Sequence, residues 1–294
     1  PIVVSIVASQ GLLIPKTSSR AITSPAGTAD VMETMTTVDL DIAAIRRVVE
    51  KESACLVWGG AVKLSPADDI LIRVERSLNL DSEGQLVASV LSKKRAAGST
   101  HVVIDVPVGP TAKVRTHEAA ELLRNLLVNV GRGIGMHVNV VLTNGIGPVG
   151  RGIGPALEAH DVLKVLRGES DAPDDLRERA VFLAGNVFDV AGHTKNSDGV
   201  ALAQRSLEDG AAWTKFQAIC EAQGGFREPG TAAFTAPVIS ERDGIVASID
   251  NRRLANVAKL AGAPHDATAG VYLDARLGSR VERGQPLYTV CAES

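Results

Sequence analysis

THVVIDVPVGP, at residues 100–110, is an almost wholly apolar run that ends in a turn rich in proline and glycine. A nearly continuous apolar run of this kind is typical of a strand in a parallel sheet, whose two faces are covered by helices. The flanking segments 81–98 and 117–130 carry apolar side chains at helical spacing, and a second strand is expected at 137–143. This order of elements predicts an α/β fold.

The same alternation extends over residues 1–222. Further strand-like runs lie at 12–15 and 54–58. Segments with helical character are 1–10, 28–35, 39–50, 155–167, 176–191 and 199–209. We therefore predict a domain at 1–222 whose mainly parallel sheet is flanked by helices.

A smaller unit is expected at 226–294. Short strand-like runs at 235–239, 244–249, 269–273 and 286–290 surround a helical stretch at 252–261. The segments at 236–246 and 278–287 resemble parts of the barrel-sandwich domain of biotinyl and lipoyl carriers. The only lysine of this unit, Lys259, lies in the helical stretch rather than on a hairpin. We predict an α+β, barrel-sandwich-like domain without the carrier function.

Composition excludes several classes of protein. A net charge of −3 gives no basic surface for nucleic acid, and 3% aromatic residues give few stacking platforms for single strands. Cys55, Cys220 and Cys291 lie far apart and without metal-ligand spacing, which favours a reducing cytoplasm and no metal site. No segment has the length and apolarity of a membrane span. The chain begins at Pro1 inside an apolar run, so we expect a fragment that lacks an N-terminal part.

KTSSRAITSPAGTAD, at residues 16–30, is a polar loop before a predicted helix. It contains the hydroxyls of Thr17, Ser18, Ser19, Thr23 and Ser24 and the cations Lys16 and Arg20. A donor-rich loop at a helix N-terminus can hold an anion, usually phosphate. A polar loop that only caps the helix is the simpler alternative.

Two further groups of polar residues are candidates for a site. Asp81 opens the helix at 81–98, in which Ser89 and Lys93 are four residues apart and share a face. A helix-starting acid and a solvated lysine would also explain this spacing. Lys113 follows the strand at 100–106, at the sheet edge where α/β proteins bind ligands, although it could be a plain surface lysine.

GIGPVG, at residues 145–150, matches the glycine pattern of dinucleotide-binding loops. Pro148 removes a backbone donor from this loop, and no strand ending in an acidic residue follows at the required distance. A glycine-rich turn between a strand and a helix is therefore preferred to an NAD site.

Together these segments resemble the thymidine/pyrimidine-nucleoside phosphorylase family. The motifs are KTSSRAITSPAGTAD (16–30), VWGGA (57–61), LSPAD (64–68), QLVASVLSKK (85–94) and VIDVPVG (103–109). The sequence of residues 18–24 is most similar to that found in the subgroup that contains AMP phosphorylase and bacterial proteins called thymidine phosphorylases.

The resemblance implies a pentosyltransferase that attacks C1′ of a nucleoside with inorganic phosphate, without a metal or other cofactor. It implies that Asp81 donates a proton to the departing base. The phosphate- or nucleotide-binding residues that it implies are Ser18, Ser19, Arg20, Ala21, Ile22, Thr23, Ser24, Thr28, Ser89 and Lys113. The base contacts that it implies are Lys93 and either Arg73 or Arg76.

The substrate stays open between a pyrimidine nucleoside such as thymidine and a nucleoside 5′-monophosphate such as AMP. An NAD-binding oxidoreductase and a non-catalytic module are weaker alternatives. The family's second phosphate motif lies upstream of Pro1, and residues 80–98 would be the remainder of a helical domain that carries dimer contacts. We therefore expect the full-length protein to be a homodimer or larger homo-oligomer, and this chain alone to be weakly active or inactive.

Overall fold

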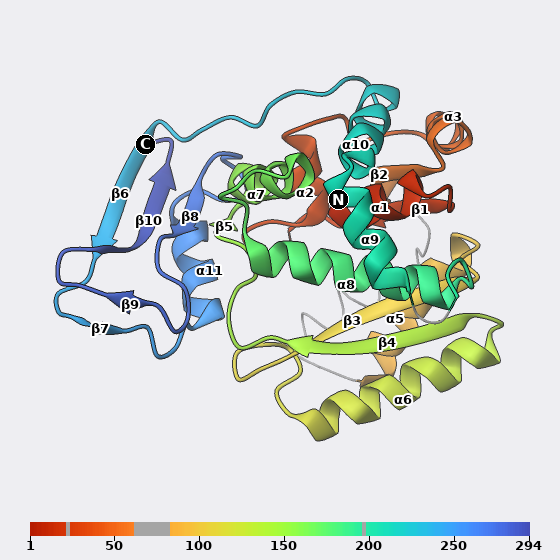
Figure 1. Ribbon diagram of the computed structural model, residues 1–294, viewed down its shortest axis with the longest axis horizontal. Coiled ribbons are helices and arrows are strands. Elements are labelled where there is room, and N and C mark those ends of the chain that lie inside the picture. Colours follow the sequence, from red (N-terminus) through yellow and green to blue (C-terminus); the bar gives the residue numbers. More distant parts are fainter. Residues whose placement is uncertain (22–23, 62–82, 196–197) are drawn as a thin grey trace. The chain divides into compact units, whose positions relative to one another are not determined.

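The computed structural model describes residues 1–21, 24–61, 83–195 and 198–294 (Figure 1). The chain divides into two compact units. The first comprises Pro1–Ala61, Gly147–Ala184 and Val200–Ser294, and the second comprises Val62–Ile146 and Gly185–Gly199. None of the described helices is long and apolar enough to cross a membrane.

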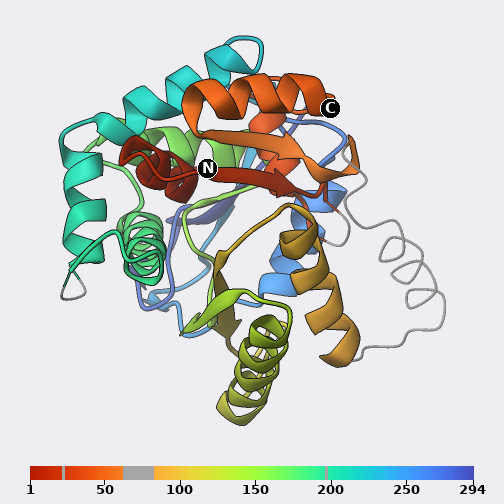
Figure 2. The same ribbon diagram turned by 90° about the vertical axis from the view of Figure 1, so that its right-hand side faces the viewer.

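A parallel pair of strands lies at the centre of the first unit. β1 (Ile14–Ser18) pairs with β2 (Ala54–Trp58), and Ser18 stands beside Trp58 at the carboxyl ends. Figure 2 shows α3 (Ile42–Glu52) lying over this pair. α3 begins where the Asp41 carboxylate accepts the Ala44 N–H at 2.7 Å, and it ends at Ser53 in a left-handed conformation. Sequence reasoning ended the first strand at Pro15, but pairing with β2 extends it to Ser18.

The remaining helices of this unit cover its core. Besides α11, described below, they are α1 (Ile2–Ser9), α2 (Thr28–Glu33), α7 (Pro155–Arg167), the first part of α8 (Asp174–Val190), α9 (Gly199–Glu208) and α10 (Ala211–Ala222). A short 3₁₀ turn, η1 (Gly59–Ala61), follows β2. α10 was not predicted, although Ala212, Phe216, Ile219 and Cys220 recur at helical spacing and are all buried. α10 packs against α1 and α3, so it closes the core around β2.

The second unit is built on the stretch at 100–110. β3 (His101–Val108) pairs in parallel with β4 (His137–Asn144), and α6 (His117–Gly133) runs alongside β4 (Figure 1). α5 (Glu83–Ala96) contributes Val87 and Leu91 to the same hydrophobic core. The predicted α/β character with parallel strands is confirmed. The assignment of 80–98 to a separate helical domain stays a prediction.

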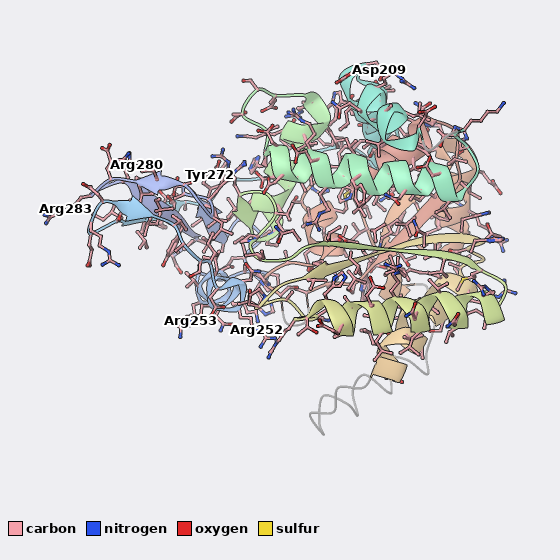
Figure 3. The ribbon with its side chains drawn as sticks, turned by 60° about the horizontal axis from the view of Figure 1, so that its bottom comes forward. Asp209, Arg252, Arg253, Tyr272, Arg280 and Arg283 are labelled. Carbon is pink, nitrogen blue, oxygen red and sulfur yellow. The ribbon has the colours of Figure 1, made fainter. Side chains whose placement is uncertain are left out.

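A small antiparallel sheet completes the first unit. Its order is β5 (Gly152–Ile153), β8 (Gly270–Leu273), β10 (Pro286–Ala292) and β6 (Phe234–Ile239). β7 (Gly244–Ile245) pairs with β9 (Arg280–Val281), and α11 (Asn251–Leu260) packs on β8 through Leu254 and Ala258. Figure 3 shows Arg252 and Arg253 projecting from α11 away from the sheet. The expected small α+β domain is present, but its edge strand β5 comes from a segment well before residue 226.

Candidate active site

The carboxyl ends of β1 and β2 position the start of the polar loop at 16–30. The Ser18 hydroxyl donates to the Val57 carbonyl at 3.3 Å, which links the last residue of β1 to the neighbouring strand. Ser19 follows and is exposed, and Thr28 is the half-buried first residue of α2. Three predicted phosphate-binding hydroxyls thus lie at this sheet edge and at the helix that follows it.

Arg20 is engaged with carboxylates of the same unit. Its Nη2 donates to Glu33 Oε1 at 2.7 Å, its Nη1 contacts Glu33 Oε2, and Asp30 Oδ1 lies 3.5 Å from Nη1. The guanidinium carbon also lies 5.1 Å from the centre of the Trp58 ring. The hydrogen bond from Arg20 lowers the pKa of Glu33 and raises the pKa of Arg20 itself. Four groups that are separate in sequence therefore form one cluster.

Asp30 closes the loop between β1 and α2. Its Oδ2 accepts the backbone N–H of Ala21 at 2.6 Å and that of Gly27 at 2.8 Å. The Ser24 hydroxyl donates to the Ala26 carbonyl at 2.8 Å and so shapes the distal part of the loop. Sequence reasoning did not single out Asp30 or Glu33, because their partners are set by the folded path of the loop.

A cavity of about 340 Å³, lined mostly by apolar residues, lies beside α2 and α7. Thr28, Glu158 and Asp161 are among its lining residues. Burial is the main cause that raises the pKa of Glu158 to about 8; the nearby Asp161 and Asp30 act in the same direction, and a hydrogen bond from the Gly154 N–H opposes them. Burial also raises the pKa of Asp161, although its Oδ2 accepts the N–H groups of Arg151 and Gly152 at 2.6 and 2.8 Å.

Sequence reasoning missed these two acids. Glu158 and Asp161 are three residues apart on α7, among the buried residues Ala159, Val162 and Leu163. Acids placed on the apolar face of a helix are the signal that could have revealed them, because buried carboxylates are concentrated at functional or hydrogen-bonded positions.

The candidates of the second unit lie on α5 and after β3. Ser89 and Lys93 are both half-buried on α5, four residues apart as predicted. Lys113 is exposed in the loop after β3, which folds back so that the Gly109 N–H donates to the Val114 carbonyl at 3.1 Å. Lys113 therefore lies at the carboxyl edge of the β3–β4 pair, as its place in the sequence predicts.

Several predicted site residues lie outside the described part of the chain. They are the expected proton donor Asp81, the alternative base contacts Arg73 and Arg76, and the loop residues Ile22 and Thr23. The roles assigned to all the site residues stay predictions.

The glycine-rich segment at 145–150 does not form the expected turn between a strand and a helix. It leads from β4 to β5, and α7 begins only at Pro155 after Gly154. The Gly145 N–H donates to the Val108 carbonyl at 2.9 Å, and a Cβ atom on Gly109 would clash with the Gly145 backbone. These glycines thus permit close packing of the two strand ends.

Within the described ranges, no three histidine, cysteine or acidic side chains gather as a metal site would require.

Comparisons with known proteins match both parts of the chain. Residues 2–213 match the glycosyl transferase family, a/b domain, and residues 245–294 match the pyrimidine nucleoside phosphorylase C-terminal domain. The chain is 62% identical over 293 residues to "Putative thymidine phosphorylase 1" of Acidovorax sp. (strain JS42) and 64% identical over 291 residues to "Putative thymidine phosphorylase" of Polaromonas sp. (strain JS666 / ATCC BAA-500). The alignments cover 100% and 99% of this chain but 57% of each relative.

Solved structures show the same fold. Anthranilate phosphoribosyltransferase from Thermus thermophilus has a TM-score of 0.60 at 19% identity, covering 76% of this chain and 72% of that one. The enzyme from Saccharomyces cerevisiae has a TM-score of 0.51 at 13% identity, covering 75% and 68%. The chain therefore belongs to the glycosyl transferase family that is defined by this α/β domain, and it carries the C-terminal domain of the pyrimidine nucleoside phosphorylases.

Proposed function

We propose that the full-length protein is a phosphorylase that cleaves the N-glycosidic bond of a pyrimidine nucleoside with inorganic phosphate. With thymidine, the products would be thymine and 2-deoxyribose 1-phosphate. The observation that carries the proposal is the match of both family domains to one chain, together with relatives above 60% identity that bear the name thymidine phosphorylase. Because the chain spans just over half of those relatives, the activity is proposed for the whole protein.

Phosphate is the nucleophile in this reaction, and its place is proposed at the start of the polar loop. Ser18, Ser19 and Thr28 would donate hydrogen bonds to its oxygens from the carboxyl end of β1 and the first turn of α2. As the glycosidic bond breaks, the sugar acquires oxocarbenium character. A fixed phosphate then stabilises the positive charge and is already placed to attack C1′.

The departing base needs a proton, which we assign to Asp81. A carboxylic acid can supply it near neutral pH only if its pKa is raised, as desolvation in a closing cleft would do. Lys93 and either Arg73 or Arg76 would contact the base. Ser89 would bind the base or the nucleotide, and Lys113 the nucleotide or a phosphate. An Asp81→Asn variant of the full-length protein should lose phosphorolysis, and undiminished turnover would exclude Asp81 as the acid.

A nucleoside 5′-monophosphate such as AMP is the second candidate substrate. It would yield the free base and ribose 1,5-bisphosphate, and it would need a cation beside the 5′-phosphate. Lys113 is exposed at the edge of the β3–β4 pair and could meet that group. The alternatives separate in a phosphorolysis screen of thymidine, uridine, AMP, CMP and UMP. Turnover of thymidine supports the first proposal, and turnover restricted to nucleotides supports the second.

The absence of all phosphorolysis by the full-length protein would refute both proposals. Tight NAD binding that phosphate does not compete with would instead favour an oxidoreductase. The chain comprising residues 1–294 should be weak or inactive beside the full-length protein, and equal turnover would refute that expectation. We also propose that the full-length protein is a homodimer or larger homo-oligomer, which light scattering can test.

A further inference from the structure

The two limbs of the loop between β1 and α2 are tied together by one carboxylate. Asp30 Oδ2 accepts N–H groups from Ala21 at 2.6 Å and from Gly27 at 2.8 Å, so a single oxygen fixes both ends of the segment 21–27. Charged acceptors make the stronger hydrogen bonds in proteins. The positions of the Ala21 and Gly27 backbones therefore depend on Asp30.

Backbone packing holds the same two limbs close. A Cβ atom on Gly27 would clash with the carbonyl oxygen of Ser19 and crowd the backbone of Arg20. The Ser19 carbonyl in turn accepts the Ala29 N–H at 3.4 Å. Ser19, a predicted phosphate ligand, is thus held against the start of α2 by its own backbone.

Arg20 supports this arrangement from the other side. Its guanidinium makes a two-point contact with Glu33, approaches Asp30 Oδ1 at 3.5 Å and lies over the Trp58 ring. A planar guanidinium in such a bidentate pair has a fixed orientation. The same geometry leaves fewer of its donors for a bound anion.

We propose that Asp30 and Glu33 are positioning residues for the phosphate-binding loop, and that Arg20 acts through them rather than by contacting phosphate. Asp30 holds the Ala21 and Gly27 backbones together, and Glu33 holds Arg20 beside Asp30 and Trp58, where the charge of Arg20 offsets the two carboxylates. This inference rests on the proposed function. It assigns to Arg20 a different task from the direct phosphate contact implied by the family resemblance.

The two roles for Arg20 predict opposite responses to a Glu33→Gln variant. If Arg20 contacted phosphate, loss of the competing carboxylate would leave phosphate binding unchanged or make it tighter. If Arg20 positions the loop, the same change loosens the loop and leaves the phosphate ligands misplaced. We expect the KM and Kd for inorganic phosphate to rise roughly 10- to 100-fold, the effect of losing about one hydrogen bond to the charged phosphate.

The experiment measures phosphate Kd by calorimetry and phosphorolysis kinetics on the full-length protein. Glu33→Gln and Arg20→Gln should each raise the phosphate KM, and the double variant should be no worse than either single one, because both remove the same contact. The KM for the nucleoside should stay within about twofold, since uniform loss of structure would alter both substrates. Glu50→Gln, an exposed carboxylate on α3, is the matched control and should change neither constant.

Each result decides for or against the inference. Unchanged or tighter phosphate binding in Glu33→Gln overturns it, and so do additive effects in the double variant. If Glu33→Gln fails to fold by circular dichroism, Glu33→Asp carries the test, because it keeps the charge but withdraws the carboxylate from Arg20. If the wild type binds phosphate without phosphorolysis, only the proposed function fails, and the phosphate Kd values still decide the role of Glu33. A wild type that binds no phosphate overturns the inference.

Discussion

Gln223 is the residue whose replacement should most clearly reveal how the first unit is held together. The side chain is only 2% exposed at the end of α10. Its Oε1 accepts the Leu56 N–H at 2.7 Å, and its Nε2 donates to the carbonyls of Thr37 and Leu56 at 2.8 and 3.1 Å. Leu56 is in the middle of β2, which pairs with β1 on its other side. Gln223 therefore takes the place of a neighbouring strand at this edge of β2.

A Gln223→Met variant keeps the size of the side chain but removes its hydrogen bonds. It leaves the Leu56 N–H buried without its partner and removes a donor from two carbonyls, and an unsatisfied buried group costs about 1–3 kcal/mol. Because the carbonyls are less costly to leave unpaired than the N–H, we expect a total loss of about 2–4 kcal/mol. In a domain of about 150–250 residues, each kcal/mol of lost stability lowers Tm by about 2–4 °C, and a fall of this order is expected here.

The measurement is urea unfolding at 25 °C, followed by far-ultraviolet circular dichroism. Gln204→Met is the matched control. Gln204 lies on α9 and makes one exposed hydrogen bond, at 2.7 Å, to Glu208 of the same helix, α9. That pair should contribute about 0.2–0.5 kcal/mol. A loss below about 1 kcal/mol for Gln223→Met would show that Gln223 does not secure this edge of β2.

Three further predictions concern burial and backbone geometry. Because the pKa of Glu158 is raised to about 8, the folded state binds this proton more tightly than the unfolded state does. The resulting stabilisation is complete below about pH 4.5 and is lost as the pH rises through 8. Glu158→Gln should flatten the dependence of Tm on pH between 5 and 9, and an unchanged slope would count against this reasoning. Burial raises the pKa of Cys55 to about 11 and that of Cys220 to about 12. A disulfide reagent at pH 8 should therefore modify both thiols far faster in urea than in buffer, and equal rates would contradict their burial. Gly270→Ala should lower the free energy of unfolding in urea by about 2–4 kcal/mol, because the added Cβ would clash with the Ile153 carbonyl across the β5–β8 pair. Gly133→Ala in α6 is the control: its Cβ would meet no neighbouring atom, so this variant should raise the free energy of unfolding by up to about 1 kcal/mol.

Elements with local start and stop signals were predicted closely from the sequence. α7 has the predicted bounds, Pro155–Arg167, because proline suits the first helical turn and Gly168 adopts the left-handed conformation that ends it. The apolar runs of β2 and β3 likewise identified strands, whereas the helix predicted at 39–50 begins three residues later as α3, at Ile42 after the Asp41 cap. In each of these, the signal lies within a few residues of the feature that it specifies.

The sequence by itself determined the α/β class, the small C-terminal domain and the family, because apolar periodicity and short motifs are local properties of the chain. Only the tertiary structure decided the extension of β1 to Ser18, the recruitment of Ile153 into a strand beside Val271, and the cluster of Arg20 with Asp30, Glu33 and Trp58. These features depend on partners that are distant in the chain or on the folded path of a loop. The polar loop at 16–30 was therefore recognisable from its residues, while the contacts that hold it closed were not.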